Sequence, residues 1–130
     1  MSNPTSIINE CLVCPQPMAA KIELCSVCIA QKIVRGKWKL VIIWLLRNGT
    51  KRFSELQRSI PQVKQSYLTH QLKELEADGL ISRKMYNVIP PRVEYSLTTR
   101  GLSFLSVMDS MNSWGKEVIR ECFPRDDAAD

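Results

Sequence analysis

Hydrophobic positions near the start of the chain recur with a helical period. From Met18 to Val34 the apolar residues fall at three- and four-residue steps, as they do on one face of a helix. The next segment, Lys37–Arg47, is apolar on nearly every side, which is typical of a helix buried in a small core. Asn48 and Gly49 end it, because glycine readily adopts the left-handed conformation that closes a helix. We therefore expect one or two helices followed by a buried helix.

Two further apolar stripes predict helices in the middle of the chain. Phe53, Leu56 and Ile60 repeat at three- and four-residue spacing and predict a short helix that ends at Pro61. The second stripe predicts a helix over residues 65–78, which Gly79 and the residue after it would close. The two helices are joined by a short turn.

The side of the 65–78 helix that points away from its leucine stripe is polar. At about 100° per residue from Leu68, four residues fall on that side, namely Ser66, Thr69, His70 and Lys73. They are hydrogen-bonding groups and one cation, with no carboxylate among them. Such a face is suited to lie against the phosphates and base edges of DNA.

Beyond Gly79 the period changes from helical to alternating. Apolar and polar residues alternate over 92–97, which predicts a half-buried strand, and residues 81–86 can pair with it. Residues 87–91 include two prolines, which cannot donate to a strand ladder, so they form the loop of a β-hairpin.

A last apolar stripe predicts a long terminal helix. Thr98 or Thr99 can cap it, and the stripe runs from Leu105 to Val118 at three- and four-residue steps. We expect the acidic segment Pro124–Asp130 to be a frayed tail.

Charge changes this picture by pointing to a partner. The chain has 130 residues, enough for one core, and a net charge of +5. Residues 31–101 carry fourteen basic and five acidic side chains, a net +9, between a leader at −1 and a C-terminal segment at −3. This asymmetry favours a polyanionic partner, with a well-solvated basic surface as the alternative. The longest apolar run, Leu40–Leu46, is too short to span a bilayer and no secretory signal is seen, so we expect a cytoplasmic protein with no membrane partner.

Several motifs follow one another in a specific order and spacing. They are Gly36–Leu40, Lys51–Leu56, Leu68–Leu80, Pro90–Thr98, and Trp114 with Gly115. Together they closely resemble the HxlR family of bacterial and archaeal transcription regulators, over roughly Cys25 to Val118. The resemblance implies a mainly α-helical fold with a small β-hairpin wing, a winged helix-turn-helix domain whose N- and C-terminal helices serve dimerisation. It implies a regulator and not an enzyme.

The resemblance also implies a homodimer bound to double-stranded operator DNA, with helix 65–78 in the major groove and residues 84–92 as the wing. The side chains expected at base edges or phosphates are polar or basic: Lys51, Arg52, Lys64, Gln65, Ser66, Thr69, His70, Lys73, Lys84 and Arg92. Family members commonly begin this helix with serine and place a basic residue two positions later, whereas this chain has Lys64 and Ser66 there. A two-fold dimer would read a near-palindrome with half-sites about 10 base pairs, or a multiple, apart.

Five cysteines need a separate interpretation. Cys11 and Cys14, and Cys25 and Cys28, form two CxxC pairs separated by ten residues. Three interpretations stay open: a zinc site of four thiolates, a thiol switch that senses oxidants, and inert apolar side chains. Zinc is the one cofactor that the sequence suggests. Cys25 lies where HxlR members commonly have a cysteine, and some members resemble thiol sensors.

We divide the chain into a cysteine-containing N-terminal leader (residues 1–24), a winged helix-turn-helix domain that resembles the HxlR type (residues 25–122) and an acidic tail (residues 123–130). A thiol oxidoreductase is one alternative, but it leaves the basic middle and the hairpin without a role, and no βαβ pattern surrounds either CxxC pair. A zinc-stapled protein-interaction module is the other. No polar constellation marks a pocket for a small effector.

Overall fold

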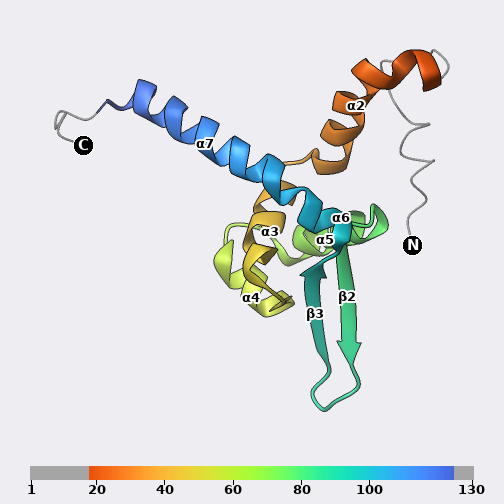
Figure 1. Ribbon diagram of the computed structural model, residues 1–130. Helices are drawn as coiled ribbons and strands as arrows, with labels where there is room; N and C mark the ends of the chain where they lie inside the picture. Colours follow the sequence, from red (N-terminus) through yellow and green to blue (C-terminus); the bar gives the residue numbers. More distant parts are fainter. Residues whose placement is uncertain (1–17, 125–130) are drawn as a thin grey trace.

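A computed structural model of the protein describes the backbone of residues 18–124 and the side chains of residues 26–124. In chain order the elements are α2 (Met18–Val34), α3 (Lys39–Leu45), the 3₁₀ turn η1 (Leu46–Asn48), β1 (Lys51–Arg52), α4 (Phe53–Ser59), α5 (Gln65–Ala77), β2 (Ile81–Tyr86), β3 (Arg92–Leu97), α6 (Thr99–Ser103) and α7 (Leu105–Cys122). In Figure 1 the hairpin of β2 and β3 extends from one side of the central helices, and α2 and α7 extend from the opposite side. Within residues 18–124, no helix is both long and apolar enough to cross a membrane.

The helix expected over Lys37–Arg47 is shorter than predicted at both ends. It begins at Lys39, after Trp38 as its N-cap residue, and its last turn tightens into η1. Gly49 follows with a φ of 137°, a conformation that other residues rarely adopt, and its N–H donates to the carbonyl of Leu46. Glycine therefore ends this segment, as the sequence indicates.

The sheet has one more strand than predicted. Its order is β1-β3-β2, all antiparallel, so β3 lies between the two outer strands. The β2–β3 hairpin has the expected bounds, with Ile81 opposite Leu97. The missed strand, β1, places Lys51 opposite Tyr95. With two residues, β1 is too short to show the alternation by which strands are detected.

The predicted terminal helix is wrong in one respect, because it is divided into α6 and α7 at Phe104. Thr98 is the cap: its hydroxyl accepts from the N–H of Gly101 at 3.1 Å and donates to the carbonyl of Gly79. Gly101 is buried against the carbonyl oxygen of Leu80, in a position that a Cβ would overlap. This close approach anchors α6 to the end of α5, while α7 continues away from the body (Figure 1).

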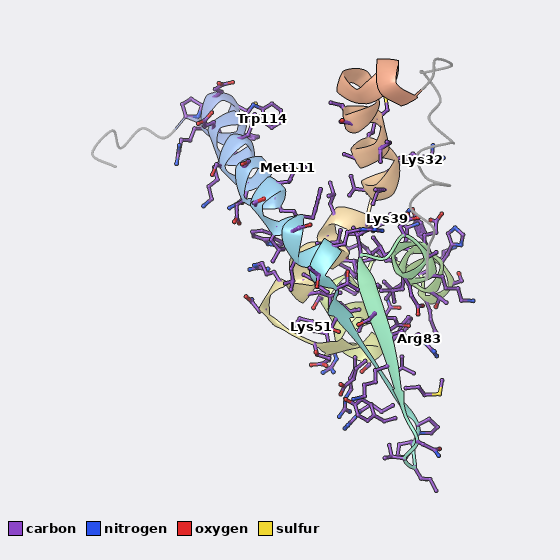
Figure 2. All side chains as sticks on the ribbon, turned by 45° about the vertical axis from the view of Figure 1, so that its right-hand side comes forward. Lys32, Lys39, Lys51, Arg83, Met111 and Trp114 are labelled. Carbon is purple, nitrogen blue, oxygen red and sulfur yellow. The ribbon has the colours of Figure 1, made fainter. Side chains whose placement is uncertain are left out.

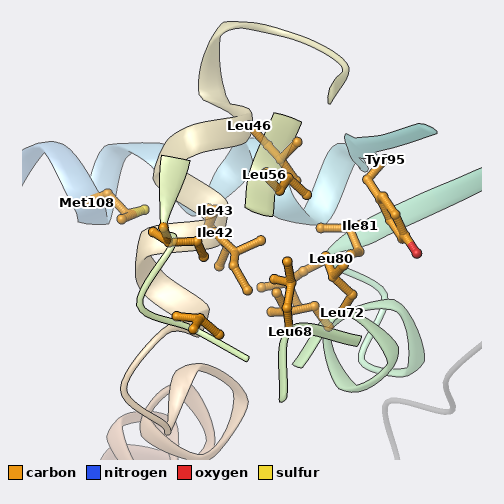
Figure 3. Packing of buried hydrophobic residues seen from close by; sticks show 13 residues of the cluster. Ile42, Ile43, Leu46, Leu56, Leu68, Leu72, Leu80, Ile81, Tyr95 and Met108 are labelled. Atoms are coloured by element: carbon orange, nitrogen blue, oxygen red, sulfur yellow. The ribbon is translucent and has the colours of Figure 1, made fainter. Parts of the chain in front are cut away.

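The core forms where α3, α4, α5 and the sheet meet. Leu68, Leu72 and Leu75 of α5 are buried against Ile42 and Ile43 of α3, within one cluster (Figure 3). This confirms the leucine stripe of α5. Along α7, by contrast, only Met108 of the predicted stripe is buried in the chain itself. The outer part of that stripe, including Met111 and Trp114, is exposed.

Candidate nucleic-acid interface

The face of α5 opposite its leucines is open to solvent. Ser66, His70 and Lys73 are exposed there, whereas Thr69 is half-buried and its hydroxyl donates to the carbonyl of Gln65 at 2.9 Å. Lys64, the N-cap residue, makes no side-chain cap hydrogen bond. The first-turn N–H groups of α5 are thus without a side-chain acceptor from the cap, next to a cation, which suits a phosphate group.

One carboxylate oxygen at the edge of this face has three side-chain nitrogen atoms within 3.4 Å. Oε1 of Glu74 lies 3.2 Å from Nζ of Lys39, 3.2 Å from Nε2 of Gln71 and 3.4 Å from Nε2 of His70. The Lys39 side chain is only 6% exposed, so its charge is inside the protein, where it forms an ion pair with Glu74. This pairing neutralises a carboxylate that would otherwise repel DNA beside His70.

The end of α5 and the start of β2 form the wall of a concave surface that contains Lys73 and Arg83. This concavity has a volume of about 920 Å³, and Arg100 on α6 also lines it. The guanidinium of Arg100 donates to the carbonyl of Asp78 at 2.7 Å, so that cation caps the end of α5. Lys73 and Arg83 remain exposed. Arg83 is absent from the predicted contacts, although a basic residue on a predicted hairpin strand was a signal for it.

Lys84 and Arg92, the cations on either side of the hairpin loop, both pack on the ring of Tyr86. Nζ of Lys84 lies 4.9 Å from the ring centroid of Tyr86, and Cζ of Arg92 lies 4.3 Å from the same ring. Nε of Arg92 is also 3.3 Å from Oε2 of Glu94. Both predicted wing cations are therefore held on one face of the two strands by cation–π contacts.

The basic residues Lys51 and Arg52 come from β1, on the other side of β3 from β2. Figure 2 shows Lys51 and Arg83 on the hairpin side of the molecule, far from Trp114 on α7. The N–H of Arg52 donates to Oε1 of Glu55 at 2.8 Å, which holds the start of α4. That hydrogen bond lowers the pKa of Glu55, with help from the nearby positive charges of Lys51, Arg52 and Arg58.

The predicted cysteine set falls largely outside the described side chains. Cys11 and Cys14 lie outside the described residues, and of Cys25 only the backbone is described, in α2. Cys28, three residues further along α2, is half-buried, and Cys122 at the end of α7 is exposed. Among the side chains that the structure describes, no group of three or more His, Cys, Asp or Glu could hold a metal ion. A four-thiolate zinc site thus stays a prediction.

The helices α3, α4 and α5, closed by a three-stranded sheet with a long β2–β3 hairpin, define a winged helix-turn-helix domain. A family model described as HxlR-like helix-turn-helix matches residues 33–122. The chain belongs to this family of transcriptional regulators.

Relatives and solved structures agree with this assignment. An HTH-type transcriptional regulator of Methanothermobacter thermautotrophicus is 47% identical over 93 residues, which cover 72% of this chain and 71% of the relative. The redox regulator HypR in its reduced form superposes with a TM-score of 0.70 at 40% identity, covering 75% of this chain and 95% of HypR. The reduced form of the transcriptional regulator YodB from B. subtilis gives a TM-score of 0.63 at 33% identity, covering 75% of this chain and 92% of YodB.

Proposed function

We propose that this protein is a homodimeric regulator that binds double-stranded operator DNA through α5 in the major groove and the β2–β3 hairpin as a wing. The observation that carries the proposal is the face of α5 on which Ser66, His70 and Lys73 are exposed, while the neighbouring Glu74 is neutralised from inside by Lys39. We assign residues 25–122 to DNA binding and pairing, residues 1–24 to a leader and residues 123–130 to a tail.

The proposed contacts divide by chemistry. Ser66, Thr69 and His70 would face base edges, since hydroxyl and imidazole groups can donate and accept hydrogen bonds in the major groove. The remaining contacts would neutralise phosphates and set the register: Lys51, Arg52, Lys64, Gln65, Lys73, Lys84, Arg92 and, from the structure, Arg83.

The apolar surface of α7 supports the proposed pairing of two chains. Trp114 is 69% exposed, Met111 and Ile119 are exposed on the same helix, and Phe123 is exposed directly after it. An apolar groove of about 370 Å³ runs between α3 and α7 beside Trp44. A second copy of the chain would cover this surface, on the side of the body away from the hairpin (Figure 1).

Selection of bound sequences from random DNA, followed by binding over a salt series, tests the DNA-binding proposal. For Lys73→Ala and Arg83→Ala we expect weaker binding and a log–log salt slope reduced by about one each. Arg120→Ala, on α7, is the matched control and should leave the slope unchanged. No enriched sequence, or unchanged slopes for both variants, would contradict the proposal.

A second candidate property is a response to oxidants. It is favoured by the similarity to the redox regulator HypR and by Cys25 and Cys28, which lie one turn apart on α2. We propose that oxidation of thiols on α2 changes operator binding. Gel shifts of reduced and diamide-treated protein should differ for the natural chain and agree for Cys25→Ser or Cys28→Ser. Release of about one zinc per chain by a chelator would favour the metal site instead.

A further inference from the structure

The large apolar side chains that the described chain exposes form two groups, apart from Val27 on α2 and Leu102 on α6. One group lies on α7 and at the residue after it, on the proposed pairing surface: Val107, Met111, Trp114, Ile119 and Phe123. The second group lies at the opposite end of the molecule, at the end of the β2–β3 hairpin, and consists of Met85, Val88 and Ile89 (Figure 1). Ile89 is fully exposed at 101%, Met85 is 59% exposed and Val88 is 49% exposed. These side chains lie outside the core cluster, and a contiguous exposed apolar group is typical of a surface that meets a partner.

The tip of the hairpin carries no charge. Residues 87–91 are Asn, Val, Ile, Pro and Pro, so neither lysine nor arginine leads the wing. The cations on either side, Lys84 and Arg92, are held back on the ring of Tyr86, and Arg92 also lies against Glu94. The tip of the wing is thus apolar, and the positive charges lie further back along the two strands.

The tip is also shaped before it meets a partner. Pro90 and Pro91 fix their own backbone angles, and the hairpin behind them is a six-pair antiparallel ladder from Ile81 opposite Leu97 to Tyr86 opposite Arg92. A preformed tip loses little conformational entropy on docking.

The geometry points to the minor groove of DNA as the partner of this tip. We infer that Ile89, supported by Val88, enters the groove as an apolar wedge between base steps, while the basic residues behind it lie at phosphates. Apolar side chains that enter the minor groove unstack base steps and bend the duplex, and flexible pyrimidine–purine steps allow this most easily. The wing would then read the deformability of the operator rather than a hydrogen-bonding pattern. This inference rests on the proposed DNA-binding function.

The test uses the full-length reduced protein and a duplex recovered by selection from random DNA. Affinity is measured over a salt series, and DNA bending is measured by energy transfer between dyes at the duplex ends. For Ile89→Ala we expect a smaller bend and binding weakened about tenfold, because the variant lacks the methyl groups that the wedge would bury against the bases. The salt slope should not change, because no phosphate contact is lost. Lys84→Ala is the matched control at the same hairpin and should lower the slope by about one.

The outcomes separate this inference from the proposed function. If Ile89→Ala bends and binds DNA as the natural chain does while Lys73→Ala still binds more weakly, the wedge is wrong and DNA binding through α5 stands. A loss of affinity for Ile89→Ala with a lower salt slope also overturns the wedge, since it means displaced phosphate contacts. If the natural chain enriches no sequence, both fail. Because Ile89 is fully exposed, the variant should keep the natural thermal midpoint, so a folding defect is recognised directly.

Discussion

Replacing one or the other member of the Lys39–Glu74 pair should have unequal consequences for stability. The Lys39 side chain is 6% exposed and its Nζ lies 3.2 Å from Oε1 of Glu74, which is itself 44% exposed. Glu74→Gln leaves a buried ammonium without its counter-charge. Lys39→Met removes the buried charge, keeps an unbranched side chain of similar length, and leaves Glu74 partly in water with Gln71 as donor and His70 beside it.

The expected magnitudes follow from this difference in burial. Removing one partner of a fully buried pair costs about 3–5 kcal/mol, whereas replacing the charge by an apolar side chain of similar volume is often neutral. Because water reaches Glu74, we expect about 2 kcal/mol for Glu74→Gln and about zero for Lys39→Met. In a domain of this size, about 2 kcal/mol lowers the thermal midpoint by roughly 10 °C.

Urea and thermal unfolding of the two variants and of the double variant measure this asymmetry. All proteins are compared at one concentration, because pairing of chains makes the thermal midpoint concentration-dependent. The double variant should be close to Lys39→Met, since the buried charge is then absent. Equal losses for the two single variants that add in the double variant would refute the reasoning, because they would show no coupling between the two charges.

Three further predictions concern other parts of the molecule. Gly101→Ala should lower the free energy of unfolding by about 2–3 kcal/mol in urea titration, because its Cβ meets the carbonyl of Leu80, while Gly115→Ala, with no atom within 4 Å of its Cβ position, should not. Glu55→Gln should make the free energy of unfolding depend less on pH on the acid side. The lowered pKa of Glu55 stabilises the fold above the ordinary carboxyl pKa, and this contribution is lost as pH falls through the folded pKa. Parallel curves of stability against pH for the variant and the natural chain would contradict this prediction. Trp114→Glu should shift sedimentation toward the monomer while far-UV circular dichroism stays unchanged, and an unchanged sedimentation profile would remove Trp114 from the proposed pairing surface.

The parts of the fold that the sequence predicts well are those with many periods of one pattern. The leucine stripe of α5 spans three buried positions, and the alternation in β3 buries Tyr95. The exposed face of α5 follows from the same geometry, since a helix with one side in the core must turn the other to solvent. For this reason the exposure of Ser66, His70 and Lys73 was predictable from Leu68 alone.

Features that depend on contacts between distant segments were not predictable. Lys39 counts as one of the surface cations in the sequence, and only the proximity of Glu74, on a different helix, explains its burial. The strand β1 exists because β3 passes beside Lys51. The division between α6 and α7 depends on the anchoring of Gly101 against Leu80. In each case the cause lies in tertiary packing and leaves no local pattern.

The break at Phe104 gives α7 the mechanics of a lever arm. α6 is fixed to the end of α5 through Thr98 and Gly101, whereas the 18 residues of α7 begin after the break at Phe104, where Met108 packs in the core, and extend over roughly 27 Å. At that length, a rotation of α7 by about 10° about its first residue displaces its far end by roughly 5 Å. In the proposed dimer, a small rotation of α7 about its start would therefore produce a large change in the spacing of the two α5 helices.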